Sequence, residues 1–296
     1  MIKNFFKEKN IEFIENASLK KYNTYRIDSK CSFLVFPKDE KELVLILKEI
    51  KKKNIKYLIL GNGSNIILNT EYFDGIIIKL THLNKVEYNE NIVTVEAGYS
   101  LIKLAQETSN RGLSGLTFAA GIPGEVGAST AMNAGAYNSD MSSIVKEVRA
   151  LNANLEIVLL NNEELDFSYR DSFLKKNPQY IVLSTTFKLG YGDALEMNQQ
   201  IIERRKKRLA SQPLDMPSAG SVFRNPENMY AGELIEKCNL KGYSINGAEI
   251  STKHANFIVN TGNAKGKDIV ELINKIKKEI KDKYNVELKL EQIIIE

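Results

Sequence analysis

The chain has 296 residues, of which 43% are hydrophobic and 26% are charged, as in an ordinary globular protein with a sizeable core. The length predicts about two domains. The net charge of +4 permits a small anionic ligand but does not predict nucleic acid as a partner. No apolar run approaches the roughly 18 residues of a membrane span, and the N-terminus lacks the pattern of a secretory signal. We therefore expect a protein outside the membrane.

The two cysteines, Cys31 and Cys238, stand alone in the sequence, with neither a CxxC pair nor a nearby set of histidines. Zinc ligands come in closely spaced groups, so this pattern does not predict a metal site. Isolated cysteines suit a reducing compartment, in which thiols stay reduced. We expect a cytoplasmic protein with two buried thiols and no metal.

Apolar periodicity and turn-forming residues predict the elements of the first two thirds of the chain. Residues 85–89 and 91–98 are short, β-branched runs separated by turn formers, which is typical of a meander. Ser100 can cap the start of a helix that Gly112 ends. The predicted helices cover 39–54 and 100–112, and the predicted strands cover 57–60, 75–80, 85–89, 91–98, 142–153, 155–160 and 179–189.

The pattern changes near residue 193, where a long charged helix is predicted to run to 212, before Pro213. A second helix near the C-terminus has one apolar face, which predicts core packing; its residues are Ile269, Leu272, Ile273, Ile276 and Ile280. A closing strand is expected over 286–296. Together these elements predict an α+β protein with a larger first region, to about residue 190, and a smaller second one.

A loop of five small or polar residues joins two apolar runs: Gly61, Asn62, Gly63, Ser64 and Asn65. Successive backbone N–H groups in a glycine-containing turn can surround an anion. The loop lacks the third glycine of the dinucleotide fingerprint, and the chain has no Walker motif. By itself the segment fits either a plain β-turn or a phosphate site.

A second unusual segment, residues 112–137, is rich in glycine and nearly free of charge. Its glycines suit a backbone that lies closely against a flat ligand, or against another backbone. A short helix starting at Gly124 would present its N-terminus to a phosphate. Two glycine-rich loops without kinase or Rossmann patterns make a dinucleotide cofactor in another fold plausible.

Three further residues have the chemistry for a reaction. Ser221, in PSAGSVFRNP (217–226), could donate a proton to a carbanion. A serine hydrolase could use only His254 as its base, and no GxSxG motif supports one. Arg170, in YRDSF (169–173), suits a carboxylate. Glu291, alone in an apolar strand, faces either outward or into a cleft.

Eight motifs in order give the chain a wider resemblance, from about residue 18 to residue 291. Together they resemble the UDP-N-acetylenolpyruvoylglucosamine reductase family, whose members complete UDP-N-acetylmuramate for peptidoglycan. The short span between YRDSF and the serine motif is similar to the second, shorter type of that family. The motifs are NTYRI (23–27), LGNGSNIIL (60–68), GLTFAAGIPGEVGASTAMNAGAY (115–137), YRDSF (169–173), AGSVFRNP (219–226), AGELIE (231–236), HANFIVN (254–260) and ELKLE (287–291).

The resemblance implies an FAD-binding domain of the vanillyl-alcohol oxidase and p-cresol methylhydroxylase type, followed by a smaller substrate domain. On this basis we expect an N-terminal segment over 1–24, an FAD domain over 25–190 with subdomains of about 25–80 and 81–190, and a substrate domain over 191–296. FAD would be non-covalent. The implied FAD contacts are Gly61, Asn62, Gly63, Ser64, Asn65, Gly121, Ile122, Pro123, Gly124, Val126, Gly127, Ala128 and Ser129.

The resemblance also implies the reaction and its catalytic residues. NADPH reduces the flavin, and hydride then passes from flavin N5 to the methylene carbon of UDP-N-acetylglucosamine enolpyruvate. Arg170 and Glu291 match the groups that stabilise the resulting enolate, and Ser221 matches the proton donor. Candidate contacts to the substrate or to NADPH are Tyr169, Arg224, Asn225, His254 and Asn256.

Two departures from the family pattern concern the sites. Gln292-Ile293 follow Glu291, where the family commonly has Val-Arg, and Asn62 replaces a common glycine, which is tolerable if its φ is negative. Two other functions stay open: a flavin oxidase of the same fold that uses O₂, and a non-catalytic module that binds a nucleotide-sugar. No nucleic acid, membrane or obligate protein partner is expected.

Overall fold

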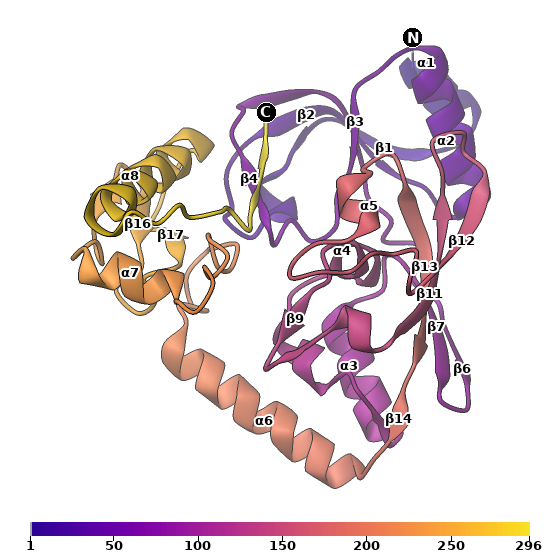
Figure 1. Cartoon of the computed structure of the whole chain (residues 1–296). Helices are drawn as coiled ribbons and strands as arrows, with labels where there is room; N and C mark the ends of the chain where they lie inside the picture. The colour runs from indigo at the N-terminus through magenta and orange to yellow at the C-terminus, as the bar shows by residue number, and fades with distance from the viewer. Residues whose placement is uncertain (1) are drawn as a thin grey trace. The chain divides into compact units, whose positions relative to one another are not determined.

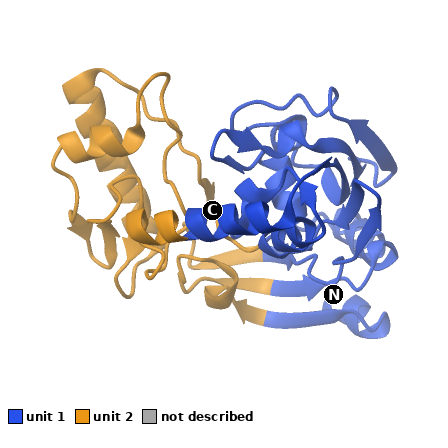
Figure 2. Cartoon of the chain, turned by 90° about the horizontal axis from the view of Figure 1, so that it is seen from below, with its two compact units in different colours: residues 1–15, 33–61, 75–205 blue, residues 16–32, 62–74, 206–296 orange. Residues whose placement is uncertain are grey.

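The computed structural model describes residues 2–296, which form two compact units (Figure 2). Unit 1 contains the chain up to Glu15, Phe33–Gly61 and Gly75–Arg205; unit 2 contains Asn16–Ser32, Asn62–Asp74 and Lys206–Glu296. Each unit combines helices with strands, so the α+β prediction is confirmed. The functional boundaries expected at residues 24 and 190 stay a prediction.

Unit 1 is built on a five-stranded antiparallel sheet in the order β12-β11-β13-β7-β6 (Figure 1). Strand β13 is buried along almost its whole length, which makes it the centre of the unit's core. The predicted meander is confirmed, because β6 and β7 pair antiparallel through a short turn. The strands are β6 (Val86–Asn89), β7 (Ile92–Glu96), β11 (Val145–Leu151), β12 (Ile157–Asn161) and β13 (Ile181–Lys188).

The helices of unit 1 begin where the sequence provides caps. The Asp39 carboxylate accepts a hydrogen bond from the backbone N–H of Glu42, and the Ser100 hydroxyl accepts one from Lys103. Both predicted helices of this region are therefore confirmed. The helical segments are α1 (Ile2–Glu8), α2 (Glu40–Lys52), α3 (Leu101–Asn110), η2 (Thr117–Gly121), α4 (Val126–Ala131), η3 (Met141–Ser143) and α5 (Phe173–Lys176).

A second sheet has four strands in the order β1-β2-β5-β3. Some residues of its strands are assigned to unit 1 and others to unit 2. Strand β3 pairs parallel with β5, which places Tyr57 opposite Ile76. Two short ladders complete this part of the chain. The strands are β1 (Glu12–Ser18), β2 (Lys30–Phe36), β3 (Tyr57–Ile59), β5 (Tyr72–Ile78), β8 (Leu113–Ser114), β9 (Gly135–Ala136), β10 (Ser139–Asp140) and β14 (Gly190–Tyr191).

In unit 2 a long helix packs on a three-stranded sheet. The apolar face predicted from the sequence is buried along α8 (Gly266–Tyr284), against β15 (Ser244–Ile245) and β16 (Ala248–Ile250). The charged helix α6 (Ala194–Ser211) belongs to unit 1 up to Arg205 and to unit 2 from Lys206, and it ends before Pro213, as predicted. The remaining elements are η1 (Lys20–Tyr22), β4 (Ile66–Leu68), α7 (Ala231–Lys237), β17 (Ile258–Asn260) and β18 (Ile293–Ile295).

The closing strand is shorter than predicted. Instead of covering 286–296, regular pairing is confined to β18, which lies parallel to β4. Leu290 makes only an isolated bridge with Phe223. The C-terminal segment therefore pairs with other parts of the protein only at β4 and at Phe223. The apolar pattern of the sequence does not show where such pairing ends.

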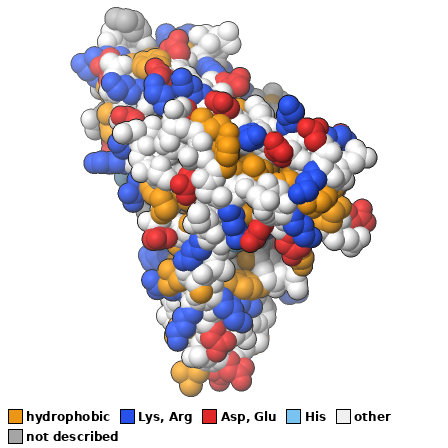
Figure 3. All heavy atoms as spheres, turned by 90° about the vertical axis from the view of Figure 1, so that its left-hand side faces the viewer, with side chains coloured by type: hydrophobic (Ala, Val, Ile, Leu, Met, Phe, Trp, Pro, Cys, Tyr) orange, Lys and Arg blue, Asp and Glu red, His pale blue; other side chains and the backbone are white. Residues whose placement is uncertain are grey.

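Cationic and anionic side chains are mixed on the surface seen in Figure 3, where Lys and Arg alternate with Asp and Glu. No helix formed by residues 2–296 combines the length and the apolar character that a bilayer-spanning segment requires. Within the same residues, no cluster of three or more His, Cys, Asp or Glu side chains could hold a metal ion. Cys31 is buried and Cys238 is partly exposed, and neither forms a disulfide.

Candidate functional site

The loop between β3 and β4 requires glycine at position 63. Gly63 has a φ of 61°, in the left-handed region, and an added Cβ would lie 2.7 Å from Asn23 Cα and closer still to Tyr22 O. Asn62 does not have a positive φ, so it can replace the common glycine of the family at this position without backbone strain. The Gly63 carbonyl accepts a hydrogen bond from the backbone N–H of Thr24 at 3.2 Å.

Two backbone donors of this loop remain available to a ligand. Within residues 2–296, the N–H groups of Gly63 and Ser64 make no hydrogen bond. Asn65 anchors the loop instead: its Nδ2 donates to Glu291 O at 3.1 Å, and its carbonyl accepts from Ile293 N at 2.9 Å. A tethered turn with two unused amides is the arrangement that an anion such as a pyrophosphate needs.

The glycine-rich segment forms a short helix two residues later than predicted, because α4 starts at Val126 rather than at Gly124. The N–H groups of Val126 and Gly127 donate to Tyr99 O and Ala97 O at 2.9 and 2.8 Å. These first amides of α4 therefore hold the helix against the end of β7. They are not available to a phosphate, so part of this segment serves close backbone packing.

A buried ion pair that the sequence did not predict lies beside Gly61. Lys79 Nζ is 3.1 Å from Glu125 Oε1 and donates a hydrogen bond of 2.6 Å to Gly61 O. Burial raises the pKa of the Glu125 carboxyl, and the Lys79 ammonium partly opposes that rise. An added Cβ at Gly61 would lie 3.2 Å from Ala128 Cβ, a tight contact that would require Ala128 to shift. The only hint of this ion pair in the sequence is Glu125, the single acid in the nearly uncharged segment 112–137.

Ser221 and Glu291 lie on neighbouring segments of unit 2. Glu291 N donates to Val222 O at 2.9 Å, and Phe223 bridges Leu290 in an antiparallel sense. This register brings the predicted proton donor and the predicted acid together from positions 70 residues apart in the chain. Within residues 2–296, the Ser221 hydroxyl makes no hydrogen bond, which leaves it able to act on a ligand.

Asn256 holds the serine segment from behind. It is 4% exposed, and its side chain accepts from Phe223 N at 3.0 Å and donates to Phe223 O at 2.9 Å. Its carbonyl accepts from Val222 N at 2.9 Å. The Asn256 amide thus holds the backbone at Phe223, which indicates a positioning role. The ligand contact expected from the sequence stays a prediction.

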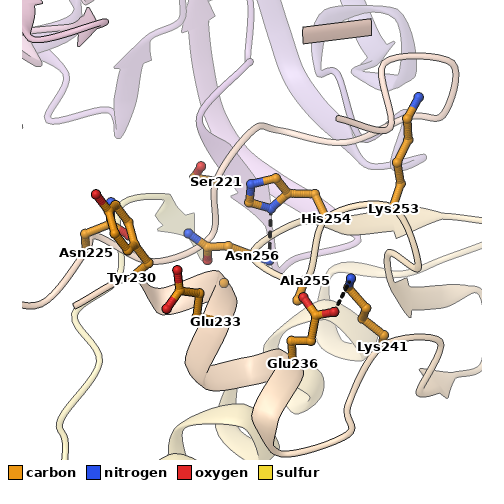
Figure 4. Close-up of a pocket in the computed structure, with 11 residues that line it drawn as sticks. Ser221, Asn225, Tyr230, Glu233, Glu236, Lys241, Lys253, His254, Ala255 and Asn256 are labelled. Carbon is orange, nitrogen blue, oxygen red and sulfur yellow. Dashed lines mark hydrogen bonds and ion pairs between the residues drawn. The ribbon is translucent and has the colours of Figure 1, made fainter. Parts of the chain in front are cut away.

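A cavity of about 330 Å³ opens beside Ser221 (Figure 4). His254 lies at its edge, and its Nδ1 accepts a hydrogen bond from Asn256 N at 3.2 Å. Burial lowers the pKa of His254, so the ring is neutral at physiological pH and its proton is on Nε2. Because Nδ1 faces a backbone N–H rather than a carboxylate, a Ser-His-acid triad is not formed. The lining residues are Ser221, Asn225, Tyr230, Gly232, Glu233, Glu236, Lys241, Lys253, His254, Ala255 and Asn256.

Two other candidates of unit 2 have structural contacts. Asn225 Oδ1 accepts from Ala231 N at 3.1 Å and thereby satisfies the first N–H of α7. Arg224 donates its backbone N–H to Lys289 O at 2.9 Å, beside the bridge between Phe223 and Leu290. Both residues therefore have positions fixed by the fold, and Asn225 also lines the cavity.

Arg170 belongs to unit 1, in the loop before α5. Its φ of 56° is unusual for a residue with a side chain, and Lys175 Nζ donates to its carbonyl at 2.9 Å. The guanidinium donates to Gly135 O and packs on the ring of the half-exposed Tyr169, 5.2 Å from its centroid. These carbonyl and ring contacts orient the guanidinium, whose planar fork of donors suits a carboxylate.

Comparison with known proteins covers nearly the whole chain. Residues 31–161 match the description "FAD binding domain", and residues 212–295 match "UDP-N-acetylenolpyruvoylglucosamine reductase, C-terminal domain". The reductase of Bacillus pumilus is 42% identical over 95% of this chain and 93% of its own length. That of Lactobacillus acidophilus is 41% identical over 98% and 97%.

A solved structure agrees with these sequence matches. The UDP-N-acetylenolpyruvylglucosamine reductase of Thermus caldophilus is 31% identical, covers 97% of this chain and 99% of its own, and superposes with a TM-score of 0.81. Sequence, domain content and fold thus lead to one conclusion: the chain belongs to the UDP-N-acetylenolpyruvoylglucosamine reductase family.

Proposed function

We propose that this protein reduces UDP-N-acetylglucosamine enolpyruvate to UDP-N-acetylmuramate, with NADPH as co-substrate and non-covalent FAD as cofactor. Membership of the reductase family supports the reaction. The main structural support for this chemistry is the pairing of Val222 with Glu291 and of Phe223 with Leu290. This pairing places Ser221, whose hydroxyl makes no hydrogen bond within residues 2–296, beside the segment of Glu291. The product is a peptidoglycan precursor, so the activity belongs to cell-wall synthesis.

The cofactor is held by the two glycine-rich segments, Gly61–Asn65 and Gly121–Ser129. The unused N–H groups of Gly63 and Ser64 suit its pyrophosphate. When bound, FAD supplies the hydride from N5 to the methylene carbon of the substrate. The small residues Gly61 and Ala128 pack closely against each other, which brings the two segments together.

Ser221 donates the proton that completes the reduction. Addition of hydride to the methylene carbon leaves an enolate, and a proton from the Ser221 hydroxyl to the adjacent carbon closes the balance. A positioned general acid typically contributes about 10²–10⁴-fold to a rate. The backbone that follows Ser221 is held by hydrogen bonds at Val222 and Phe223.

Arg170 and Glu291 stabilise the charge that develops on the enolate and its carboxylate. Arg170 contributes a permanent cation in a fixed fork, and the Glu291 carboxyl group contributes a hydrogen bond. Groups placed before the reaction lower the barrier because they need no reorganisation in the transition state. Removing one of them typically costs about 10²–10³ in rate.

The nucleotide part of the substrate, and NADPH in its turn, would contact the remaining candidates. Tyr169 presents an exposed ring, Arg224 a cation, and His254 an Nε2–H donor at the cavity edge. Asn225 lines the same cavity, while Asn256 acts by holding the backbone at Phe223. We also assign the chain to the shorter type of the family and to the cytoplasm, where the two isolated thiols stay reduced.

An anaerobic experiment tests the proposal. The flavin of the purified protein is reduced with NADPH, excess NADPH is removed, and UDP-N-acetylglucosamine enolpyruvate is added while the flavin absorbance is followed. Rapid return of the oxidised spectrum with formation of UDP-N-acetylmuramate is the expected result. A flavin that stays reduced until air enters would indicate an oxidase. Failure to bind added FAD would contradict a flavoenzyme altogether.

A further inference from the structure

Gln292 connects the segment of Glu291 to the residues that precede Ser221. Its side chain is buried, and its Nε2 donates hydrogen bonds to Ala219 O at 3.0 Å and to Gly220 O at 3.1 Å. Its Oε1 accepts one from the hydroxyl of Tyr25 at 3.0 Å, and Tyr25 is itself fully buried. The amide of Gln292 therefore uses both of its donors and its acceptor within the protein.

The residue before the serine is a conformational weak point. Gly220 has a φ of 74°, and the space that a Cβ would occupy has no heavy atom within 4 Å. A glycine with open space at the Cβ position can change its dihedral angles at little steric cost. Nothing in the packing of Gly220 fixes the direction of the Ser221 side chain, so the hydrogen bonds of its carbonyl must do so.

We propose that Gln292 is a positioning residue for proton transfer: it holds the carbonyls of Ala219 and Gly220 and so fixes the direction in which Ser221 points. The inference rests on the proposed role of Ser221 as proton donor. On the far side of the serine, Val222 is held by Glu291 N and Asn256 O. Gln292 thus supplies the only side-chain hydrogen bonds to the two carbonyls preceding Ser221 that are found within residues 2–296.

The proposal distinguishes two steps of the same catalytic cycle. Reduction of the flavin by NADPH transfers a hydride and needs no proton from Ser221. Reoxidation by the enolpyruvyl substrate needs that proton, and a misdirected hydroxyl slows it. A role in folding alone would lower stability without separating the two steps.

The test replaces Gln292 by Leu, which has a similar volume and no hydrogen-bonding group, and measures both steps by anaerobic stopped flow on the FAD-loaded protein. We expect Gln292→Leu to slow reoxidation by about tenfold or more, with an increased solvent deuterium isotope effect. Flavin reduction by NADPH should stay within about twofold of the wild-type rate. Gln292→Met, which adapts more easily to the cavity, serves if the Leu variant does not fold.

Tyr25→Phe is the matched control, because it removes the partner of Oε1 but leaves both carbonyl contacts of Gln292 in place. Its reoxidation rate should remain within about twofold of wild type. Equal slowing of both steps in the Gln292 variants, or no slowing in either, would overturn the proposal. A wild-type protein whose reduced flavin is not reoxidised by the substrate would contradict the proposed function instead.

Discussion

Lys79→Met tests whether the buried ion pair beside Gly61 is needed for stability. The side chains of Lys79 and Glu125 are only 5% and 7% exposed, and the ammonium also donates to Gly61 O. Met keeps the length of the side chain but removes the charge and every donor. The variant leaves a carboxylate without a counter-ion in a low-dielectric environment.

The expected loss of unfolding free energy is about 3–5 kcal/mol, the typical effect of removing one partner of a buried pair. Burial already raises the pKa of Glu125, and loss of Lys79 raises it further. The folded state then holds a proton more tightly than the unfolded chain does, so the stability of Lys79→Met falls as pH rises above the unfolded pKa. The deficit should be largest near about pH 8 and shrink toward about pH 5.

Urea unfolding of the FAD-free protein across this pH range measures the effect. The double variant Lys79→Met/Glu125→Gln contains neither charge, and it should recover most of the lost stability and lose the pH dependence. A deficit in Lys79→Met that does not change with pH would refute the assignment to an uncompensated Glu125. So would a double variant that is no more stable than the single one.

The other predictions concern the loop Gly61–Asn65 and the residues around Ser221. Ser221→Cys, which keeps a transferable proton, should retain more reoxidation activity than Ser221→Ala; equal losses in stopped flow would argue against proton donation. Gly63→Ala should weaken FAD binding about tenfold or more, measured by flavin fluorescence, because alanine is strained at its φ and meets neighbouring backbone. Asn256→Ala should lower stability by about 1–3 kcal/mol and also slow reoxidation, whereas Asn260→Ala, another buried amide bonded to backbone, should lower stability alone. Burial lowers the pKa of His254, so the unfolded chain binds more protons and stability should fall as pH drops through about 6.5; in His254→Gln this slope should be smaller in urea titrations.

Local signals predicted much of the secondary structure. Ser100 starts α3, and the apolar face of α8 is buried, because caps and periodicity act over a few residues. The same signals misplaced two elements. Helix α4 begins at Val126 rather than Gly124, and regular pairing of the last strand is limited to Ile293–Ile295. In both cases the limit is set by a partner that is distant in the sequence.

The sequence by itself determined the α+β class, the caps that start α2 and α3 and, through ordered motifs, the family of the chain. Only the tertiary structure decided which residues support the candidate site. Glu125 pairs with Lys79, which is 46 residues away in the sequence, and Gln292 donates to Ala219, which is 73 residues away. Each of these contacts gives a buried polar group its hydrogen-bond partner. The local sequence does not predict that partner, because burial depends on how the whole chain packs.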